Sequence, residues 1–217
     1  MDLTLPQQIY LCAYAFKKDK FPATLLQFRG QRIRAAALTE LILAQQAETD
    51  GRRVRVLGDR SPADPFLASV WEELHAGPKK WMALVHNRAH TAEKPVEDQL
   101  MAAGIIEKKT GHTFSLLRGS KVVLRQKEEA RAVQQALRTR VTTTPDPSTL
   151  PLEQVALPVI ALESDATMGV VLDRSERRQH KEALEESARK FDREVPGLRK
   201  ALSNSVLSSR AVGGGWS

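Results

Sequence analysis

The sequence predicts a mainly α-helical protein: a single domain with a central bundle of apolar helices, amphipathic outer helices and short β-hairpins in winged-helix-like units. Apolar residues recur at three- and four-residue steps through most of the 217 residues, the spacing of one helix face. Segments with period-two alternation are short, and each follows a predicted helix. We expect residues 1–212 to form the domain and the glycine-rich residues 213–217 to be a flexible tail.

The first third of the chain predicts two helices and a hairpin. Thr4 has the spacing of a capping box before a helix over about residues 5–18. A second helix, over about residues 31–47, carries alanines that would let another helix approach closely. Asp50-Gly51 is a turn signal, and the alternation at Val54–Leu57 predicts a strand after it.

The middle of the chain repeats this order of helices followed by a hairpin. We expect helices over about residues 65–74, 78–88 and 95–103, the last two opened by a proline at the first helical position. Two predicted strands, at Ile105–Glu107 and Thr113–Leu117, flank a polar turn. Two units of this outline are typical of winged-helix proteins.

The last third predicts helices only. A charged helix over about residues 127–140 precedes Leu152–Glu163, the most apolar segment of the chain, which we interpret as a buried central helix interrupted at Pro158. Residues 175–192 combine high charge with a narrow apolar stripe, which predicts an exposed amphipathic helix. One more helix is expected from Leu198.

Composition limits the function classes. The chain has 33 Lys and Arg against 26 Asp and Glu, a formal net charge of +7, which favours acidic partners such as phosphate groups. Its single cysteine, Cys12, excludes an intramolecular disulfide and a multi-cysteine zinc site, and suits a reducing compartment. No stretch approaches eighteen apolar residues, and no leader pattern opens the chain. We therefore expect a cytoplasmic protein.

No reactive constellation emerges from the residues. His86 and His90 have a spacing that can bind one metal ion, but Asn87 stands where a zincin has its general base, and no third ligand is evident. A solvated helix face is the better interpretation. Cys12 falls on the apolar face of the first helix, which indicates packing. We predict no catalytic residue, no metal and no cofactor.

Two groups of basic residues are candidate phosphate sites. Arg29, Arg32 and Arg34 cluster where a loop meets a helix N-terminus, whose amides add positive potential to guanidinium groups that match phosphate geometry. A second cluster could follow an extended anionic surface. Either group could equally be a solvated charged face. The second cluster comprises Arg118, Lys121, Arg125, Lys127, Arg131, Arg138 and Arg140.

Several segments, taken in order, resemble the Golgi phosphoprotein 3 family. They are Leu3-Thr4-Leu5-Pro6-Gln7-Gln8, Ile33-Arg34-Ala35-Ala36-Ala37-Leu38-Thr39-Glu40-Leu41 and Val96-Glu97-Asp98-Gln99-Leu100-Met101-Ala102-Ala103-Gly104-Ile105-Ile106. Eukaryotic members of this family bind phosphatidylinositol 4-phosphate on the Golgi membrane, and many relatives are bacterial. The richness in alanine and arginine is more similar to a bacterial member. The resemblance spans essentially the whole chain and implies one mostly helical domain.

The resemblance implies a lipid-phosphate pocket that this chain matches only in part. The family's pocket arginine corresponds to Arg34, while its tryptophan would fall near Leu25. Two further family arginines would fall near His90 and Glu93, and Arg88 is the nearest basic residue. Losing an aromatic ring and reversing one charge would weaken the recognition of a phosphate, which needs charge-assisted donors.

The resemblance also implies a contact with the membrane. The family's exposed apolar hairpin, implicated in membrane contact and self-association, would correspond to Glu107–Leu117. Phe114, Leu116 and Leu117 would then touch the bilayer or a second copy in a homo-oligomer, although they could equally be core residues.

The leading hypothesis is a non-enzymatic peripheral membrane protein on the cytoplasmic face, which binds anionic, phosphoinositide-like lipid head groups. The candidate lipid-phosphate residues are Arg29, Arg32, Arg34, Arg88 and His90. The alternatives are a nucleic-acid-binding regulator of the winged-helix type and an adaptor that has lost lipid binding. Nucleic acid is the less favoured partner, because the helix that would enter a groove is rich in alanine and leucine and suits burial.

Overall fold

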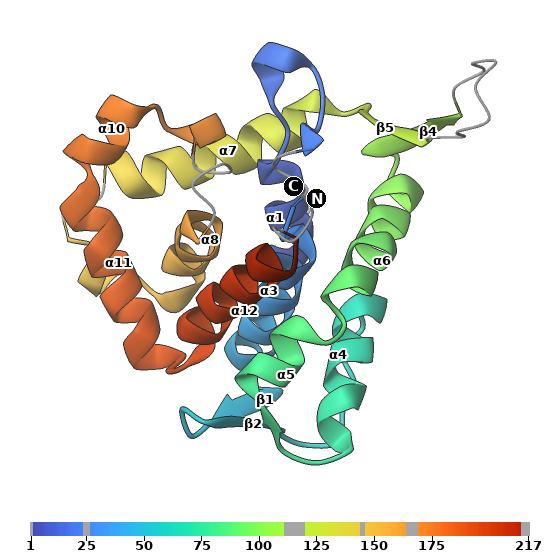
Figure 1. Cartoon of the computed structure of the whole chain (residues 1–217), viewed down its shortest axis with the longest axis vertical. Helices are drawn as coiled ribbons and strands as arrows, with labels where there is room; N and C mark the ends of the chain where they lie inside the picture. The colour runs from blue at the N-terminus through green and yellow to red at the C-terminus, as the bar shows by residue number, and fades with distance from the viewer. Residues whose placement is uncertain (1, 24–26, 111–119, 144–145, 164–168, 214–217) are drawn as a thin grey trace.

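The computed structural model describes residues 2–23, 27–110, 120–143, 146–163 and 169–213 and confirms a mainly helical fold with short antiparallel strand pairs (Figure 1). The elements, in chain order, are α1 Leu5–Cys12, η1 Phe16–Lys18, α3 Arg29–Leu43, β1 Ala47–Thr49, β2 Arg53–Val56, α4 Pro65–His75, β3 Lys79–Lys80, α5 Trp81–His86, α6 Ala89–Ala102, β4 Ile106–Thr110, β5 Ser120–Leu124, α7 Lys127–Thr142, η2 Pro147–Thr149, α8 Leu152–Leu162, α10 Arg174–Gln179, α11 Lys181–Glu194 and α12 Leu198–Gly213.

Helix α3 is the centre of the fold. It packs against α1, α4, α5, α6, α8 and α12, and every residue from Arg29 to Thr39 is buried. A helix surrounded on all sides needs small side chains where its neighbours approach most closely. Ala35, Ala36 and Ala37 supply them, each with no exposed surface.

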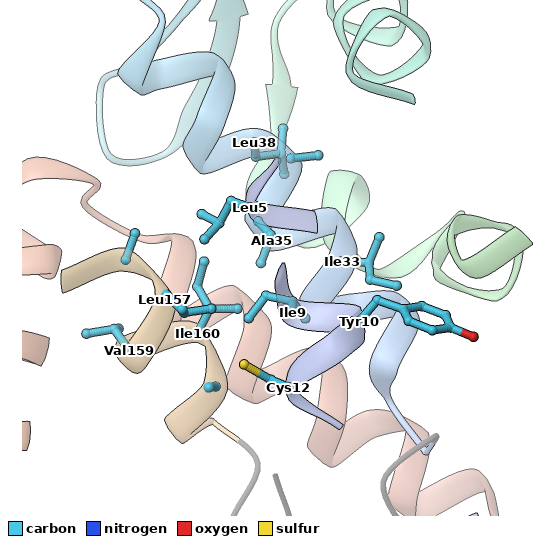
Figure 2. Close-up of a cluster of buried hydrophobic side chains, with 14 of the residues drawn as sticks. Leu5, Ile9, Tyr10, Cys12, Ile33, Ala35, Leu38, Leu157, Val159 and Ile160 are labelled. Atoms are coloured by element: carbon cyan, nitrogen blue, oxygen red, sulfur yellow. The ribbon is translucent and has the colours of Figure 1, made fainter. Parts of the chain in front are cut away.

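The predicted buried helix is confirmed as α8. Its residues from Val155 to Ala161 are all buried, and Pro158 lies inside the helix without ending it. Side chains of α8 interdigitate with those of α1 and α3 (Figure 2). Ile9, Ile33 and Leu157 are almost completely excluded from water in this cluster. The core therefore joins segments that are about 150 residues apart in the sequence.

Both predicted helix–hairpin units are present. In the first, β1 pairs with β2 in an antiparallel register that places Ala47 opposite Val56. A third strand, β3, adds to the other edge of β2. The expectation that Pro78 opens a helix is therefore wrong: Lys79 and Lys80 are used in the strand pairing, and α5 begins only at Trp81.

The second unit differs from its prediction in the position of the turn. Strand β4 continues to Thr110 and pairs with β5, so Lys108 and Lys109 lie in a strand and not in the predicted turn. The predicted strand over residues 113–117, with Phe114, Leu116 and Leu117, lies outside the described residues. The β4–β5 ribbon projects from the helical body at the upper right of Figure 1.

Helix boundaries differ at several places. The second helix, α3, ends at Leu43 and not at residue 47, because Ala47 pairs with Val56 in β1. The first helix ends at Cys12, not at residue 18, because a bridge between Ala15 and Lys20 closes a tight loop. Pro95 lies inside α6, which begins at Ala89 because its first turn packs against α3. Residues 175–192 form two helices separated at His180, and of the predicted tail only Gly213 is described.

Candidate functional site

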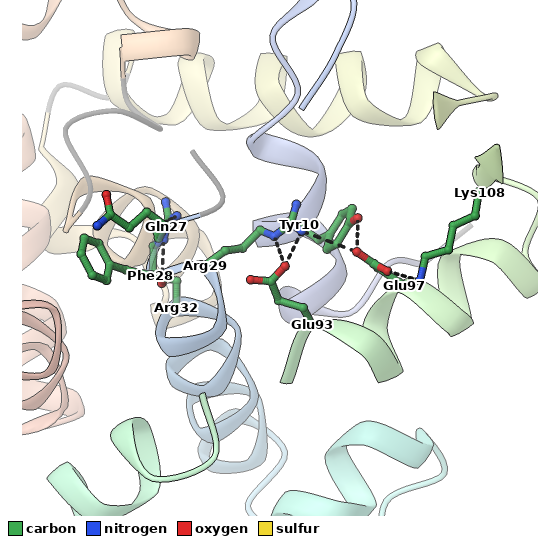
Figure 3. A network of polar contacts seen from close by, with 8 residues as sticks. All are labelled: Tyr10, Gln27, Phe28, Arg29, Arg32, Glu93, Glu97 and Lys108. Carbon is green, nitrogen blue, oxygen red and sulfur yellow. Dashed lines mark hydrogen bonds and ion pairs between the residues drawn. The ribbon is translucent and has the colours of Figure 1, made fainter. Parts of the chain in front are cut away.

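The three arginines predicted to hold a phosphate, Arg29, Arg32 and Arg34, are buried at the start of α3. Their exposed fractions are 2%, 1% and 2%. The helix places them on different sides, and each contacts a different part of the protein. Figure 3 shows Arg29 directed toward Tyr10 and Glu93, and Arg32 directed toward the carbonyl groups that precede the helix.

Arg29 is held by two carboxylates and one aromatic ring. Its Nε donates to Glu93 Oε2 at 3.0 Å, and its Nη2 lies 3.6 Å from Glu97 Oε1. The guanidinium carbon stacks 3.9 Å from the centroid of the Tyr10 ring. Glu97 also accepts hydrogen bonds from the Tyr10 hydroxyl at 2.9 Å and from Lys108 Nζ at 2.6 Å. Burial raises the pKa of Tyr10 and keeps the phenol protonated.

Glu93 makes this network self-neutralising. The resemblance places a cationic residue of the implied pocket near this position, whereas here the side chain is an acid that pairs with Arg29. A buried cation needs a partner of opposite charge, and Glu93 supplies it from α6. Of the Arg29 donors, Nη1 has no hydrogen-bond partner in the described part of the chain. Side chains of the protein thus already contact most of the Arg29 guanidinium group.

Arg34 is used completely within the protein. Its Nε donates to the Leu84 carbonyl at 2.6 Å. Its Nη1 and Nη2 donate to the two oxygens of Glu73 at 2.9 Å and 2.8 Å. Arg88 approaches the same carboxylate, with Nη1 at 3.3 Å from Glu73 Oε1. Arg34 and Arg88, two of the candidate lipid-phosphate residues, therefore lie close together, but both contact an internal carboxylate.

The remaining residues of the predicted site lie in contrasting environments. Arg32 contacts the Gln27 carbonyl at 3.4 Å, and burial lowers its pKa to about 10, which leaves it protonated at neutral pH. Arg88 and His90 are exposed near the start of α6. Leu25, which stands near the position of the family tryptophan, lies outside the described residues.

Residues with possible metal or nucleophilic chemistry are dispersed. His86 Nδ1 is 2.9 Å from Ser205 Oγ, while His90 points to solvent. Cys12 has no exposed surface, and desolvation raises its thiol pKa to about 12. No group of three or more His, Cys, Asp or Glu side chains gathers within reach of one ion among the described residues.

The second predicted basic cluster is largely neutralised on its own surface. Arg125 pairs with Glu107, and Arg138 pairs with Glu176. Burial lowers the pKa of Arg140, and Arg118 lies outside the described residues. Two more ion pairs are Lys127 with Asp19 at 2.5 Å and Arg131 with Glu128 at 2.9 Å.

A different group of cations has no such compensation. Arg52, Arg53, Lys80 and Lys200, which we call the basic edge, are all exposed, and none forms an ion pair within the described parts of the chain. They come from the first hairpin turn, from β2, from β3 and from the first turn of α12. They line one cavity of about 630 Å³, together with Trp81, Met82, Ala201, Asn204 and the glycines Gly51 and Gly197.

Sequence reasoning missed the basic edge because its members are distant in the chain. The pairs Arg52-Arg53 and Lys79-Lys80 each follow a turn signal, which is the one local hint. Only the register of β2 and β3 reveals that Arg53 lies directly opposite Lys80. Only the packing of α12 beside α5 brings Lys200 to the same cavity.

The fold and its surface define a mainly helical protein with two helix–hairpin units, internally paired arginines and a basic edge that forms no ion pair in the part of the chain that the structure describes. A family model of Golgi phosphoprotein 3 (GPP34) matches residues 5–205. The chain therefore belongs to the Golgi phosphoprotein 3 family, which confirms the resemblance drawn from the sequence. This family is not known as a family of enzymes. Among curated proteins, none matches the chain. No helix in the described ranges is long and apolar enough to cross a membrane.

Proposed function

We propose that this protein is a non-enzymatic peripheral membrane protein that binds anionic lipid head groups, phosphoinositide-like ones among them. The observation that supports the proposal is the basic edge, whose four exposed cations have no ion-pair partner in the described chain. Family membership over residues 5–205 and the net charge of +7 agree with it.

Charge alone supports a weak and reversible attachment. Each cation near an anionic membrane surface contributes about 1 kcal/mol, so four of them contribute roughly 4 kcal/mol, close to a thousandfold in the binding constant. Ionic screening reduces this attraction over a Debye length of about 8 Å at physiological salt. Binding should therefore weaken as salt increases, unless a defined pocket adds short-range contacts.

The nucleic-acid alternative has less support. A winged-helix reader inserts the helix that precedes its hairpin into the major groove. In the first unit that helix is α3, which is buried from Arg29 to Thr39 and packed against α1, α4, α5, α6, α8 and α12. A helix in this position cannot enter a groove without unfolding the core.

Co-sedimentation with vesicles tests the proposal. The full chain should pellet with phosphatidylcholine vesicles that contain increasing anionic lipid, and should stay in the supernatant with phosphatidylcholine alone. An excess of duplex DNA should displace less than half of the bound protein. Equal pelleting with neutral and anionic vesicles, or none with either, would contradict the proposal.

A variant pair decides which residues take part. The candidate residues Arg88 and His90 remain a prediction, and the double variant Arg88→Ala/His90→Ala tests them. We expect it to retain most of the vesicle binding, because Arg88 already contacts Glu73 and neither residue lines the cavity of the basic edge. The double variant Arg52→Ala/Lys200→Ala should bind several-fold more weakly. If Arg88→Ala/His90→Ala weakened vesicle binding more than Arg52→Ala/Lys200→Ala, the lipid site would lie at the start of α6 and not at the basic edge.

A further inference from the structure

The cavity lined by the basic edge has the features of a specific anion site. We infer that it binds a phosphate monoester, presented either on a lipid head group or on a small soluble molecule. The inference that the phosphate belongs to a lipid head group rests on the proposed function, whereas the inference that it belongs to a small soluble molecule does not. The family-derived candidates Arg34 and His90 are not part of this cavity.

The strand register places two like charges face to face. Arg53 and Lys80 are directly opposite partners in the β2–β3 pair, so their side chains leave the same face of the sheet. Like charges in this position destabilise a sheet. Glu48 pairs with Arg55 on the neighbouring strand, so this sheet does offset a cation with a carboxylate elsewhere. An anion held between Arg53 and Lys80 would remove their repulsion.

The floor of the cavity is built before any ligand arrives. Gly197, with φ of +92°, lies against the hairpin turn: a Cβ there would be 2.4 Å from the Gly51 carbonyl oxygen and 2.8 Å from Trp81 Cδ1. The Trp81 indole donates to the Pro196 carbonyl at 2.9 Å, and its side chain is only 4% exposed. Two turns in contact and a fixed indole give the cavity a set shape, which limits the entropy lost on binding.

The donors around this floor suit a doubly charged phosphate. The two arginines supply planar forks that match phosphate oxygens, and the two lysines supply compact positive charges. The amide of Asn204 adds a neutral hydrogen-bonding group. The N-terminus of α12, which begins at Leu198 beside the cavity, adds the positive end of a helix dipole.

The Asp50 carboxylate of the first hairpin is bound within its own turn. Asp50 Oδ1 accepts from the backbone amides of Arg52 and Arg53 at 2.8 Å and 2.7 Å. These bonds hold the Asp50 pKa below its usual range, so the group stays ionised. It stabilises the hairpin turn. It forms no ion pair with either arginine side chain in the described residues, although the charge of Arg53 also helps to lower the Asp50 pKa. The cavity volume of about 630 Å³ lies within the range of small-molecule sites.

Two binding measurements test the site on the full-length chain. Isothermal titration calorimetry uses inositol 1-phosphate and inorganic phosphate as soluble probes, with unphosphorylated inositol as the blank. Co-sedimentation uses vesicles with phosphatidic acid, a phosphate monoester, against vesicles with phosphatidylglycerol, a diester, adjusted to equal total negative charge. We expect binding of inositol 1-phosphate, none of inositol, and a preference for phosphatidic acid that survives moderate salt.

The decisive variant is Arg53→Ala/Lys80→Ala. It should weaken inositol 1-phosphate binding by at least about tenfold, since hydrogen bonds between charged groups are the strong ones. The matched control, Lys18→Ala/Arg60→Ala, removes the same two residue types from exposed positions outside the cavity and should stay within about twofold. Because the variant removes a like-charge pair, its thermal midpoint should not fall below that of the wild type.

The outcomes separate the two proposals. Soluble phosphate binding without vesicle binding would support the cavity and overturn the membrane function. Vesicle binding that follows total charge and is equal in variant and control would overturn the cavity and keep the membrane function. Equal losses in variant and control, or tighter binding of duplex DNA than of either phosphate probe, would also overturn the cavity.

Discussion

Arg34 and Glu73 form a two-pronged ion pair between α3 and α4, with both nitrogen–oxygen distances below 3.0 Å. The Arg34 side chain is 3% exposed and that of Glu73 is 16% exposed. The third donor of Arg34 reaches the Leu84 carbonyl in α5, so one guanidinium joins three helices. The residue that the resemblance aligned with the family's pocket arginine thus ties three helices together.

The Arg34 pair predicts a large loss of stability on truncation. Arg34→Ala removes both bonds to the partly buried Glu73, which keeps its longer contact with Arg88, and also removes the bond to the Leu84 carbonyl. We expect a cost of about 3 kcal/mol in the free energy of unfolding. Arg34→Lys should recover little of this loss, because an ammonium cannot reproduce the fork. Urea unfolding followed by circular dichroism measures the effect.

An exposed pair provides the control for that experiment. Lys94 pairs with Asp98 one helical turn away on the surface of α6, so Lys94→Ala should cost no more than about 0.5 kcal/mol. If Arg34→Ala cost as little as Lys94→Ala, the Arg34 guanidinium would be free for a ligand.

A close helix crossing predicts that Gly30 cannot be enlarged. A Cβ on Gly30 would lie 1.9 Å from the Ala89 carbonyl oxygen, so α3 and the start of α6 would have to separate. We expect Gly30→Ala to destabilise the protein by about 1–3 kcal/mol or more, although alanine favours helices over glycine by about 1 kcal/mol. Gly169→Ala is the control, since its Cβ would meet no atom within 4 Å. Similar unfolding midpoints for the two variants would disprove the tight crossing.

The burial of Cys12 predicts an unreactive thiol. With its pKa raised to about 12 by desolvation, only about one molecule in ten thousand would carry the thiolate at pH 8. A chromogenic disulfide reagent should therefore label Cys12 within seconds in denaturant and at least a hundredfold more slowly in the native state. Fast labelling of the native protein would show that α1 opens readily.

The raised pKa of Glu40 should make the free energy of unfolding decrease as the pH rises. Burial raises its pKa from 4.5 to about 7, although the Leu5 amide donates to Oε2 at 2.7 Å. A carboxyl with a raised pKa in the folded state contributes its full stability below the unfolded pKa and loses it through the folded pKa. As the pH rises from about 4.5 to about 7, the wild type should thus lose unfolding free energy relative to Glu40→Gln. A difference that stays constant over this window would mean that Glu40 is well solvated.

Local sequence signals predicted the helices but not all of their limits. The apolar run at Leu152–Glu163 and the alanine-rich segment after Arg34 are both buried in the centre, as their composition indicated. The predicted helix starts at Pro78 and Pro95 were wrong. A proline is compatible with several backbone positions, and packing against other elements decides which of them it occupies. After Pro78, the chain pairs with β2 as strand β3, and the helix that contains Pro95, α6, packs against α3.

By itself, the sequence determined the fold class, the family, the burial of Cys12 and the excess of positive charge. These depend on periodicity, composition and the order of motifs, which are local or additive properties. Tertiary structure decided which charges are available. Glu73 and Glu93 neutralise Arg34 and Arg29 across helices. In contrast, β3 and α12 bring Lys80 and Lys200 beside Arg53, and none of these three cations forms an ion pair within the described residues. The attraction between two charges weakens as the distance between them increases. Whether a cation is neutralised therefore depends on which carboxylates the fold brings close to it, and no local sequence pattern encodes these distances.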